Sequence, residues 1–179
     1  LNTNYVCLKA FLESKQDIKE GISKKIGYLN SLEVITDNYF SENFGNTFFT
    51  IENARKIGFI REEIDQISES EEEKNILLCS LIYAADKIAN TVGHYDAFRK
   101  KLDSVKPITL LIPDINYTSN LNNEVFNEDA NTLIRKITCD VLYIDPPYNS
   151  RQYSDAYHLL ENLAEWKKPK VEGIAKKMD

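Results

Sequence analysis

The sequence predicts an α/β protein in which a mainly helical block precedes part of a β-sheet. Two observations favour this fold class. Residues 51–67 and 75–92 carry apolar side chains three or four positions apart, the spacing of amphipathic helices. After residue 107 the pattern changes, because a helix-like run at 130–137 lies among short β-like runs (108–112, 124–127 and 139–145). A β-α-β unit with a parallel pair of strands is the simplest arrangement of such runs.

The first half of the chain is predicted to consist of helices and irregular connections. A short helix covers residues 4–14, and a polar, irregular segment follows it to about Phe40. An aromatic strand or loop then leads to Thr50, a residue type that favours the N-cap of a helix, so the helix 51–67 begins after it. The acidic run SESEEEK between the two long helices is expected to be a solvated turn.

Length, charge and cysteine spacing limit the class of protein. The 179 residues, 42% of them hydrophobic, suffice for one domain with a core, or for one domain with an insertion. No apolar run has the length of a membrane span and no signal segment opens the chain, so a cytoplasmic protein is expected. Cys7, Cys79 and Cys139 lie far apart in apolar surroundings and are expected to be reduced core residues. The net charge of −6 argues against a protein that coats nucleic acid but allows a local basic groove.

The stretch VLYIDPPY is the strongest functional signal. Its quartet is Asp145, Pro146, Pro147 and Tyr148. Because two prolines disfavour the interior of a strand or a helix, the quartet is expected to form a rigid turn after a strand, where open α/β sheets bind ligands. Average residue usage gives this tetrapeptide by chance in roughly one chain of this length per thousand. A proline-rich turn without function is the structural alternative, and the position of the tyrosine excludes a PPxY ligand of WW domains.

The chemistry of the quartet suits a flat ring with an exocyclic amine, such as adenine. The amine lone pair is delocalised into the ring, and the carboxylate of Asp145 with the carbonyl of Pro146 would accept its two hydrogens and expose that pair. Tyr148 would stack on a base that is flipped out of a duplex. Asp129 stands 16 positions before Asp145, also after a β-like run, so the two carboxylates are expected to face the same crevice.

Several stretches of the sequence, in a consistent order, resemble one family. They are NTVGHYDAFRK, FNEDAN, DVLYIDPPYNSRQY with YHLLENLA, and KPKVEGIAKK. The set is similar to the adenine-specific DNA methyltransferases of restriction–modification systems, in the group whose recognition region precedes Asp-Pro-Pro-Tyr. The resemblance implies a Rossmann-like sheet that binds S-adenosylmethionine, with an inserted, mainly helical recognition subdomain. It also implies methyl transfer to the N6 amine of a flipped adenine in double-stranded DNA.

The resemblance further implies roles for single residues. The catalytic residues would be Asp145, Pro146, Pro147 and Tyr148. The cofactor-binding residues would be Asp129 and Ala130 at the cofactor adenine, Asp145 beside them, and Asn2 near the place of an acidic residue that holds the ribose. Methyl transfer from a sulfonium needs no metal, and no stretch has the spacing of zinc ligands.

Two groups of residues are expected to contact DNA, because cations bind phosphates and aromatic loops fill the gap left by a flipped base. They are His94, Tyr95, Arg99 and Lys100 before the quartet, and Asn149, Arg151 and Tyr153 after it. A cognate restriction endonuclease is a further expected partner.

The resemblance divides the chain into three parts. Residues 1–20 would be the start of a catalytic segment, a helix after a missing strand; 21–107 the helical target-recognition subdomain; and 108–179 the catalytic α/β segment. None of the six glycines forms the family's F-x-G-x-G loop. The chain is therefore expected to be the central part of such an enzyme, with an incomplete cofactor pocket.

Two other functions stay open at this point. A helical block without the glycine-rich loop also fits a non-catalytic DNA-recognition module. The same chemistry with RNA or a protein amide as acceptor is the third hypothesis, and Asp at position 145 in place of Asn argues against it.

Overall fold

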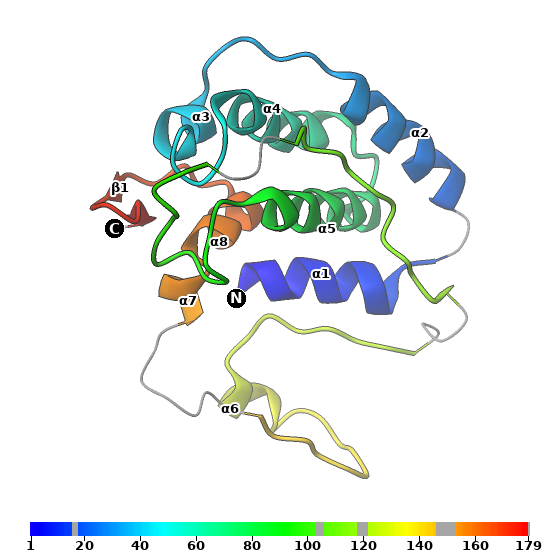
Figure 1. Cartoon of the computed structure of the whole chain (residues 1–179). Coiled ribbons are helices and arrows are strands. Elements are labelled where there is room, and N and C mark those ends of the chain that lie inside the picture. The colour runs from blue at the N-terminus through cyan, green and yellow to red at the C-terminus, as the bar shows by residue number, and fades with distance from the viewer. Residues whose placement is uncertain (16–17, 103–105, 118–121, 146–152, 179) are drawn as a thin grey trace.

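A computed structural model describes residues 1–15, 18–102, 106–117, 122–145 and 153–178. The described part is mainly helical, with one two-stranded antiparallel sheet (Figure 1). The elements are α1 (Asn2–Glu13), α2 (Lys19–Ser31), α3 (Tyr39–Phe44), α4 (Ile51–Ile67), α5 (Glu71–Ile88), α6 (Ala130–Leu133), α7 (Tyr153–Ala156), α8 (His158–Glu165), β1 (Val171–Glu172) and β2 (Lys177–Met178).

Helix α5 forms the centre of the core. It packs against α1, α4 and α8 (Figure 1), and each of these helices buries apolar side chains completely. These fully buried side chains include Ala10, Ile64, Leu77 and Leu163. The core therefore joins segments from both ends of the sequence. The division at residues 20 and 107 stays a prediction, while helices on either side of both positions share this core.

The predicted helices at 4–14 and 51–67 are confirmed as α1 and α4. Thr50 is the N-cap of α4, as expected, because its hydroxyl accepts a hydrogen bond from the N–H of Asn53 at 3.3 Å. The predicted acidic turn is partly wrong. Ser70 caps α5, and Glu71 to Glu73 form the first turn of that helix, where carboxylates favour the positive end of the helix dipole.

The segment before Phe40, expected to be irregular, contains the helix α2. That prediction was wrong because Gly21 and Gly27, which lower helix propensity, obscured an apolar face with a period of three to four residues. This face buries Ile22, Ile26 and Leu29. The aromatic stretch that follows also begins as a helix, α3, which is capped by the side chain of Asn38.

The predicted strand 108–112 is extended but pairs with no strand among the described residues. Side-chain amides satisfy its backbone instead. Asn53 accepts from the N–H of Ile108 at 2.9 Å, while Asn30 bonds the N–H and the carbonyl of Leu110 at 2.8 and 2.9 Å. Ile108 and Leu110 point into the core, so the alternation of a strand is kept without a sheet.

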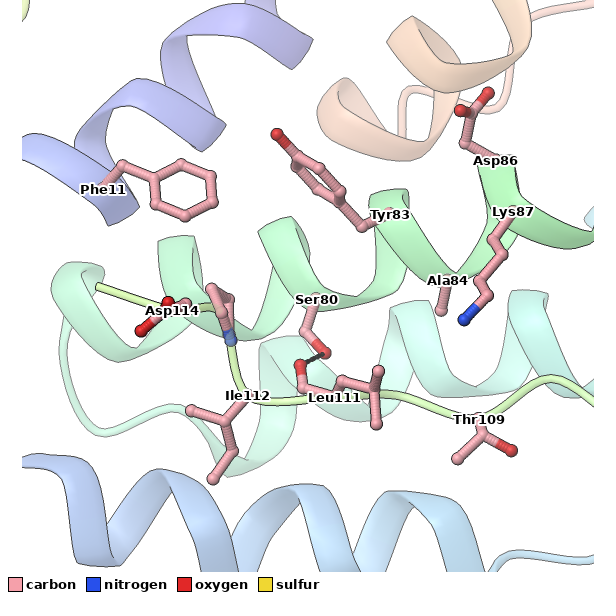
Figure 2. A pocket seen from close by; sticks show the side chains of 11 residues that line it. Phe11, Ser80, Tyr83, Ala84, Asp86, Lys87, Thr109, Leu111, Ile112 and Asp114 are labelled. Atoms are coloured by element: carbon pink, nitrogen blue, oxygen red, sulfur yellow. Dashed lines mark hydrogen bonds between the residues drawn. The ribbon is translucent and has the colours of Figure 1, made fainter. Parts of the chain in front are cut away.

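Figure 2 shows the outer side of this extended segment. There Ser80 of α5 donates a hydrogen bond to the carbonyl of Leu111 at 2.6 Å. A hollow of about 450 Å³ lies along α5 at this place, and the edge-to-face pair Phe11 and Tyr83 lines it.

The predicted β-α-β unit is not formed within the described residues. The runs at 124–127 and 139–145 form no strand there, and Asp140 lies in a bend. Only four residues of the predicted helix 130–137 are helical, as α6. Parallel strands need neighbours and apolar cover on both faces. The described residues supply neither to the run 141–144, in which the side chains of Val141 and Tyr143 are both 84% exposed.

The prediction that all three cysteines lie in the core is wrong for Cys139. Cys79 is buried and Cys7 half-buried, but Cys139 is exposed because it lies in the segment without a sheet. Within the described ranges, no helix is both long enough and apolar enough to cross a membrane.

Candidate active site

The residues 122–145, here called the arm, hold the candidate site. The first part of the arm, residues 123–127, runs alongside α1 from its C-terminal to its N-terminal end, and α6 with the loop after it projects away from α1 (Figure 1). Asn123 donates to the carbonyl of Leu12 at 3.0 Å, and Asn127 donates to Oδ1 of Asn2 at 2.8 Å. These bonds bring the start of α6 to the N-terminus of α1.

Asp129 lies at the N-cap of α6. Its Oδ1 accepts hydrogen bonds from the backbone N–H of Thr132 at 3.0 Å and from the hydroxyl of Thr132 at 3.2 Å. This local cap explains why a helix begins directly after the β-like run, and it fixes the orientation of an exposed carboxylate.

A hollow of about 540 Å³ lies between the α6 segment and the run that ends at Asp145. Its walls are mainly apolar, with the carboxylate of Asp145 at one end of the run; the lining residues are Ala130, Asn131, Leu133, Ile134, Ile137, Leu142, Tyr143, Ile144 and Asp145. Ala130 and Asp145 therefore share one hollow, and Asp129 directly precedes it. Apolar walls with a few polar groups suit a flat aromatic ring that carries an amine.

The rest of the predicted catalytic and DNA-contact residues after Asp145 lie outside the described residues. These are Pro146, Pro147, Tyr148, Asn149 and Arg151. For Tyr153 the structure describes the helix α7 that it begins, but not its side chain.

Asn2, the predicted ribose residue, is held by carboxylates of α8. Its backbone N–H and its side-chain amide donate to Oε1 of Glu161 at 2.6 and 2.8 Å, and the amide also donates to Glu165. Through Asn127 it contacts the arm two positions from Asp129. Asn2 thus contacts the arm near Asp129, but it is not among the residues that line the hollow described above.

Sequence reasoning missed Glu161, which is only 7% exposed. The carboxylate receives the backbone N–H and the hydroxyl of Thr3 at 3.0 and 2.9 Å, in addition to the bonds from Asn2. Burial acts to raise the pKa of Glu161, but the hydrogen bonds from Thr3 and Asn2 outweigh it, so the pKa is lowered. Glu161 therefore serves as the anion at the N-terminus of α1.

The predicted DNA-contact stretch before the quartet divides into exposed and buried residues. Arg99 and Lys100 are exposed and His94 is half-buried. Tyr95 is only 1% exposed, its hydroxyl donates to Asp86 at 2.8 Å, and burial raises its pKa. Its burial argues against a direct contact with DNA. Tyr95 instead packs inside the protein and supports this loop.

Comparisons with known proteins identify the family of the chain. A family model described as D12 class N6 adenine-specific DNA methyltransferase matches residues 1–178. The modification methylase StsI of Streptococcus sanguinis is 39% identical over 193 residues, and the type II methyltransferase M.FokI of Planomicrobium okeanokoites is 36% identical over 193 residues. The type II methyltransferase M.NlaIII of Neisseria lactamica is 40% identical over 123 residues.

These matches cover 98%, 95% and 65% of this chain, but only 30%, 29% and 36% of the respective relatives. The chain thus spans about a third of the length of the curated relatives that it matches. No solved structure matches it. Since the family model covers nearly every residue, the chain belongs to the family of D12 class N6 adenine-specific DNA methyltransferases.

Proposed function

We propose that the protein is a site-specific DNA methyltransferase that transfers a methyl group from S-adenosylmethionine to the N6 amine of adenine in double-stranded DNA. One observation carries the proposal: in a chain of this family, Asp145 and Ala130 line one mainly apolar hollow. The relatives named as modification methylases or type II methyltransferases give further support.

The residues around the hollow fit the adenine end of the cofactor. Leu133, Ile134 and Leu142 would cover the faces of the ring and exclude water, and the capped carboxylate of Asp129, which directly precedes Ala130, would accept the ring's amine. Asn2 is the candidate for the ribose. When bound, S-adenosylmethionine supplies an electrophilic methyl group on its sulfonium.

Asp145 and the residues directly after it would act on the target base. The carboxylate of Asp145 and the carbonyl of Pro146 accept the two amine hydrogens of the flipped adenine, which directs the nitrogen lone pair at the methyl group. Tyr148 stacks on the base. The proton leaves the nitrogen after the transfer, so no strong base is required.

The remaining assignments concern DNA and the fold. Exposed Arg99 and Lys100 with His94 are the proposed DNA contacts of the loop, and Asn149, Arg151 and Tyr153 those near the target base. The exposed apolar run 141–144 would be a strand of a Rossmann-like sheet, with 21–107 as the recognition part between the catalytic segments 1–20 and 108–179. A restriction endonuclease with the same DNA specificity is the proposed partner.

The test is to incubate the full-length protein with duplex DNA and methyl-labelled S-adenosylmethionine and to identify the product by mass spectrometry of the nucleosides. We expect N6-methyladenine at a fixed sequence. Label on cytosine or on RNA alone would contradict the proposed substrate, and DNA binding without any transfer would support the recognition module instead.

A further inference from the structure

Asn90 lies at the base of the candidate DNA-contact loop (residues 91–100), directly after the C-cap of α5, and is only 4% exposed. Its backbone N–H donates to the carbonyl of Phe48 at 2.8 Å, and its side-chain amide donates to the carbonyl of Thr47 at 3.0 Å. The side chain of Phe48 is fully buried in the turn between α3 and α4. These two bonds therefore tie the start of the loop to the aromatic part of the core.

The same residue also holds the end of the loop. The side-chain amide of Asn90 donates a second hydrogen bond to the carbonyl of Arg99 at 2.8 Å, and the N–H of Arg99 donates to the carbonyl of Asn90 at 3.2 Å. Both backbone polar groups of Arg99 are thus bonded to one residue. Between them, Thr91 and Phe98 form an antiparallel bridge, so the loop is closed at its base.

A carboxamide is the side chain that suits this place. Two carbonyl oxygens lie within hydrogen-bond distance of one side-chain nitrogen, and the NH₂ group of asparagine supplies two donors. An aspartate of the same shape would turn an acceptor toward both carbonyls, and an alanine would remove both donors. The described residues offer no partner to Oδ1 of Asn90. A buried oxygen without a partner costs stability, a local conflict that is typical of functional sites.

Two aromatic rings hold the rest of the loop against the same support. The rings of Tyr95 and Phe98 pack on Phe48, with centroids 5.7 and 5.3 Å apart. The side chains of Arg99 and Lys100 are exposed, although the backbone of Arg99 is fixed. A fixed backbone with exposed cations suits a contact with phosphates, because the loop then need not be ordered when DNA binds.

We propose that Asn90 is a positioning residue for DNA binding, whose amide clamps the backbone of Arg99 and so holds the side chains of Arg99 and Lys100 ready for the phosphates. This role rests on the proposed function, because the clamp serves DNA only if the protein binds DNA. Asn90 itself makes no contact with DNA. Loss of the clamp leaves both cations in the chain, but the bound DNA must then order the loop.

The first experiment tests the clamp without DNA. Hydrogen–deuterium exchange of the Arg99 N–H, measured by mass spectrometry with fragmentation to single residues, should be slow in the wild type and fast in N90D. The matched control is N53D, because Asn53 is 6% exposed and its amide donates to the carbonyl of Lys106 at 2.9 Å, outside the candidate loop. N53D should leave the exchange at Arg99 unchanged. Exchange as fast in the wild type as in N90D would overturn the proposal.

The second experiment measures the affinity of the full-length protein for a fluorescein-labelled DNA duplex of mixed sequence by anisotropy. We expect N90D to raise Kd by roughly five- to 30-fold, the factor that corresponds to fixing the backbone of one residue. The slope of log affinity against log salt concentration should stay at the wild-type value, because both cations remain. N53D should bind as the wild type does. Equal affinities of the wild type and N90D would overturn the clamp alone, whereas a wild type that binds no DNA would overturn the proposed function as well.

A double-mutant cycle separates positioning from general support of the fold. If Asn90 acts through Arg99 and Lys100, N90D should change Kd by less than about twofold in an R99A/K100A background. The same five- to 30-fold loss in both backgrounds would make Asn90 a structural residue only and would overturn the proposal.

N90A takes the place of N90D if the aspartate variant does not fold. It removes both donors without turning an acceptor toward the two carbonyls. Folded N90A should show fast exchange of the Arg99 N–H and weaker DNA binding. Exchange and affinity at wild-type values in N90A would overturn the proposal.

Discussion

The helical body and the arm differ in what holds them. Helices α1, α4, α5 and α8 share a core of completely buried side chains, whereas every residue of the arm except Val125 and Leu133 is exposed. The candidate active-site hollow belongs to the arm, and the candidate DNA-contact loop to the body. The difference indicates that stability and chemistry are carried by separate parts, so substitutions should affect one without the other.

The largest expected effect is that of D145A in the full-length protein. Loss of the carboxylate that is proposed to direct the amine nitrogen should lower kcat by at least about 100-fold, the effect of removing one group that stabilises a transition state. DNA affinity should stay within about threefold, since the interaction acts on rate more than on binding. Single-turnover methylation and DNA titration measure the two.

The matched control for D145A is D140A, an exposed aspartate of the same arm outside the hollow. Both variants should keep the unfolding free energy within about 0.5 kcal/mol of wild type, as for most surface substitutions. Near-normal turnover of D145A would contradict the proposed catalytic role of the arm. A large loss of unfolding free energy in D145A would contradict the idea that the body alone carries the stability.

The same contrast explains what could be predicted from the sequence. Helices α1 and α4 were predictable because their periodicity and the Thr50 cap are local. The strands of the arm were not confirmed, since a strand depends on a partner backbone and not on β-branched residues alone. Asp145 stood out through a local pattern, while Glu161 did not, because it bonds Asn2 across 159 positions.

Within the body, two glycines in helices should respond oppositely to alanine. A Cβ on Gly58 of α4 would lie 2.1 Å from Oδ1 of Asn38, the oxygen that caps α3, and 2.9 Å from Cβ of Phe40. We expect G58A to lower the unfolding free energy by about 1–3 kcal/mol, the cost of overpacking. Apart from Gly27 itself, its chain neighbours and the backbone of its own helix, no atom lies within 4 Å of a Cβ on Gly27 of α2.

G27A is therefore the control, and it should raise the unfolding free energy by about 0.5–1 kcal/mol through helix propensity alone. Urea unfolding of both variants measures the pair. If both substitutions changed the unfolding free energy by the same amount in the same direction, the contact between α4 and the α3 cap would not contribute to the stability of the helical body.

Glu161 gives the body a pH dependence. Its pKa is lowered in the folded state, so its stabilisation is complete above the unfolded value near 4.3 and is lost as the pH falls through the folded value. We expect E161Q to lower the unfolding free energy by about 1–2 kcal/mol at pH 7, because the charged acceptor is lost. The difference in unfolding free energy between wild type and variant should become smaller below about pH 4.

The control for E161Q is E172Q, in which an exposed glutamate of β1 is neutralised. It should change the unfolding free energy little at either pH. Urea unfolding at pH 7 and pH 3.5 measures both variants. A gap for E161Q that stays constant across this range would mean that the Glu161 charge does not hold the N-terminus of α1.

The smallest effect concerns DNA binding by the body. Lys100 is exposed in the loop whose internal support is Tyr95, so K100A should remove one phosphate contact and leave the fold intact. Each neutralised phosphate contributes about 0.9 to the slope of log affinity against log salt concentration. K100A should therefore lower that slope by about one. Between 50 and 200 mM salt the wild type would then lose about threefold more affinity than the variant.

K24A is the control, because Lys24 on α2 pairs with Glu20 at 2.7 Å and lies outside the candidate loop. If the slope for K100A stayed at the wild-type value, or if K24A lowered it equally, the DNA contacts would lie outside this loop.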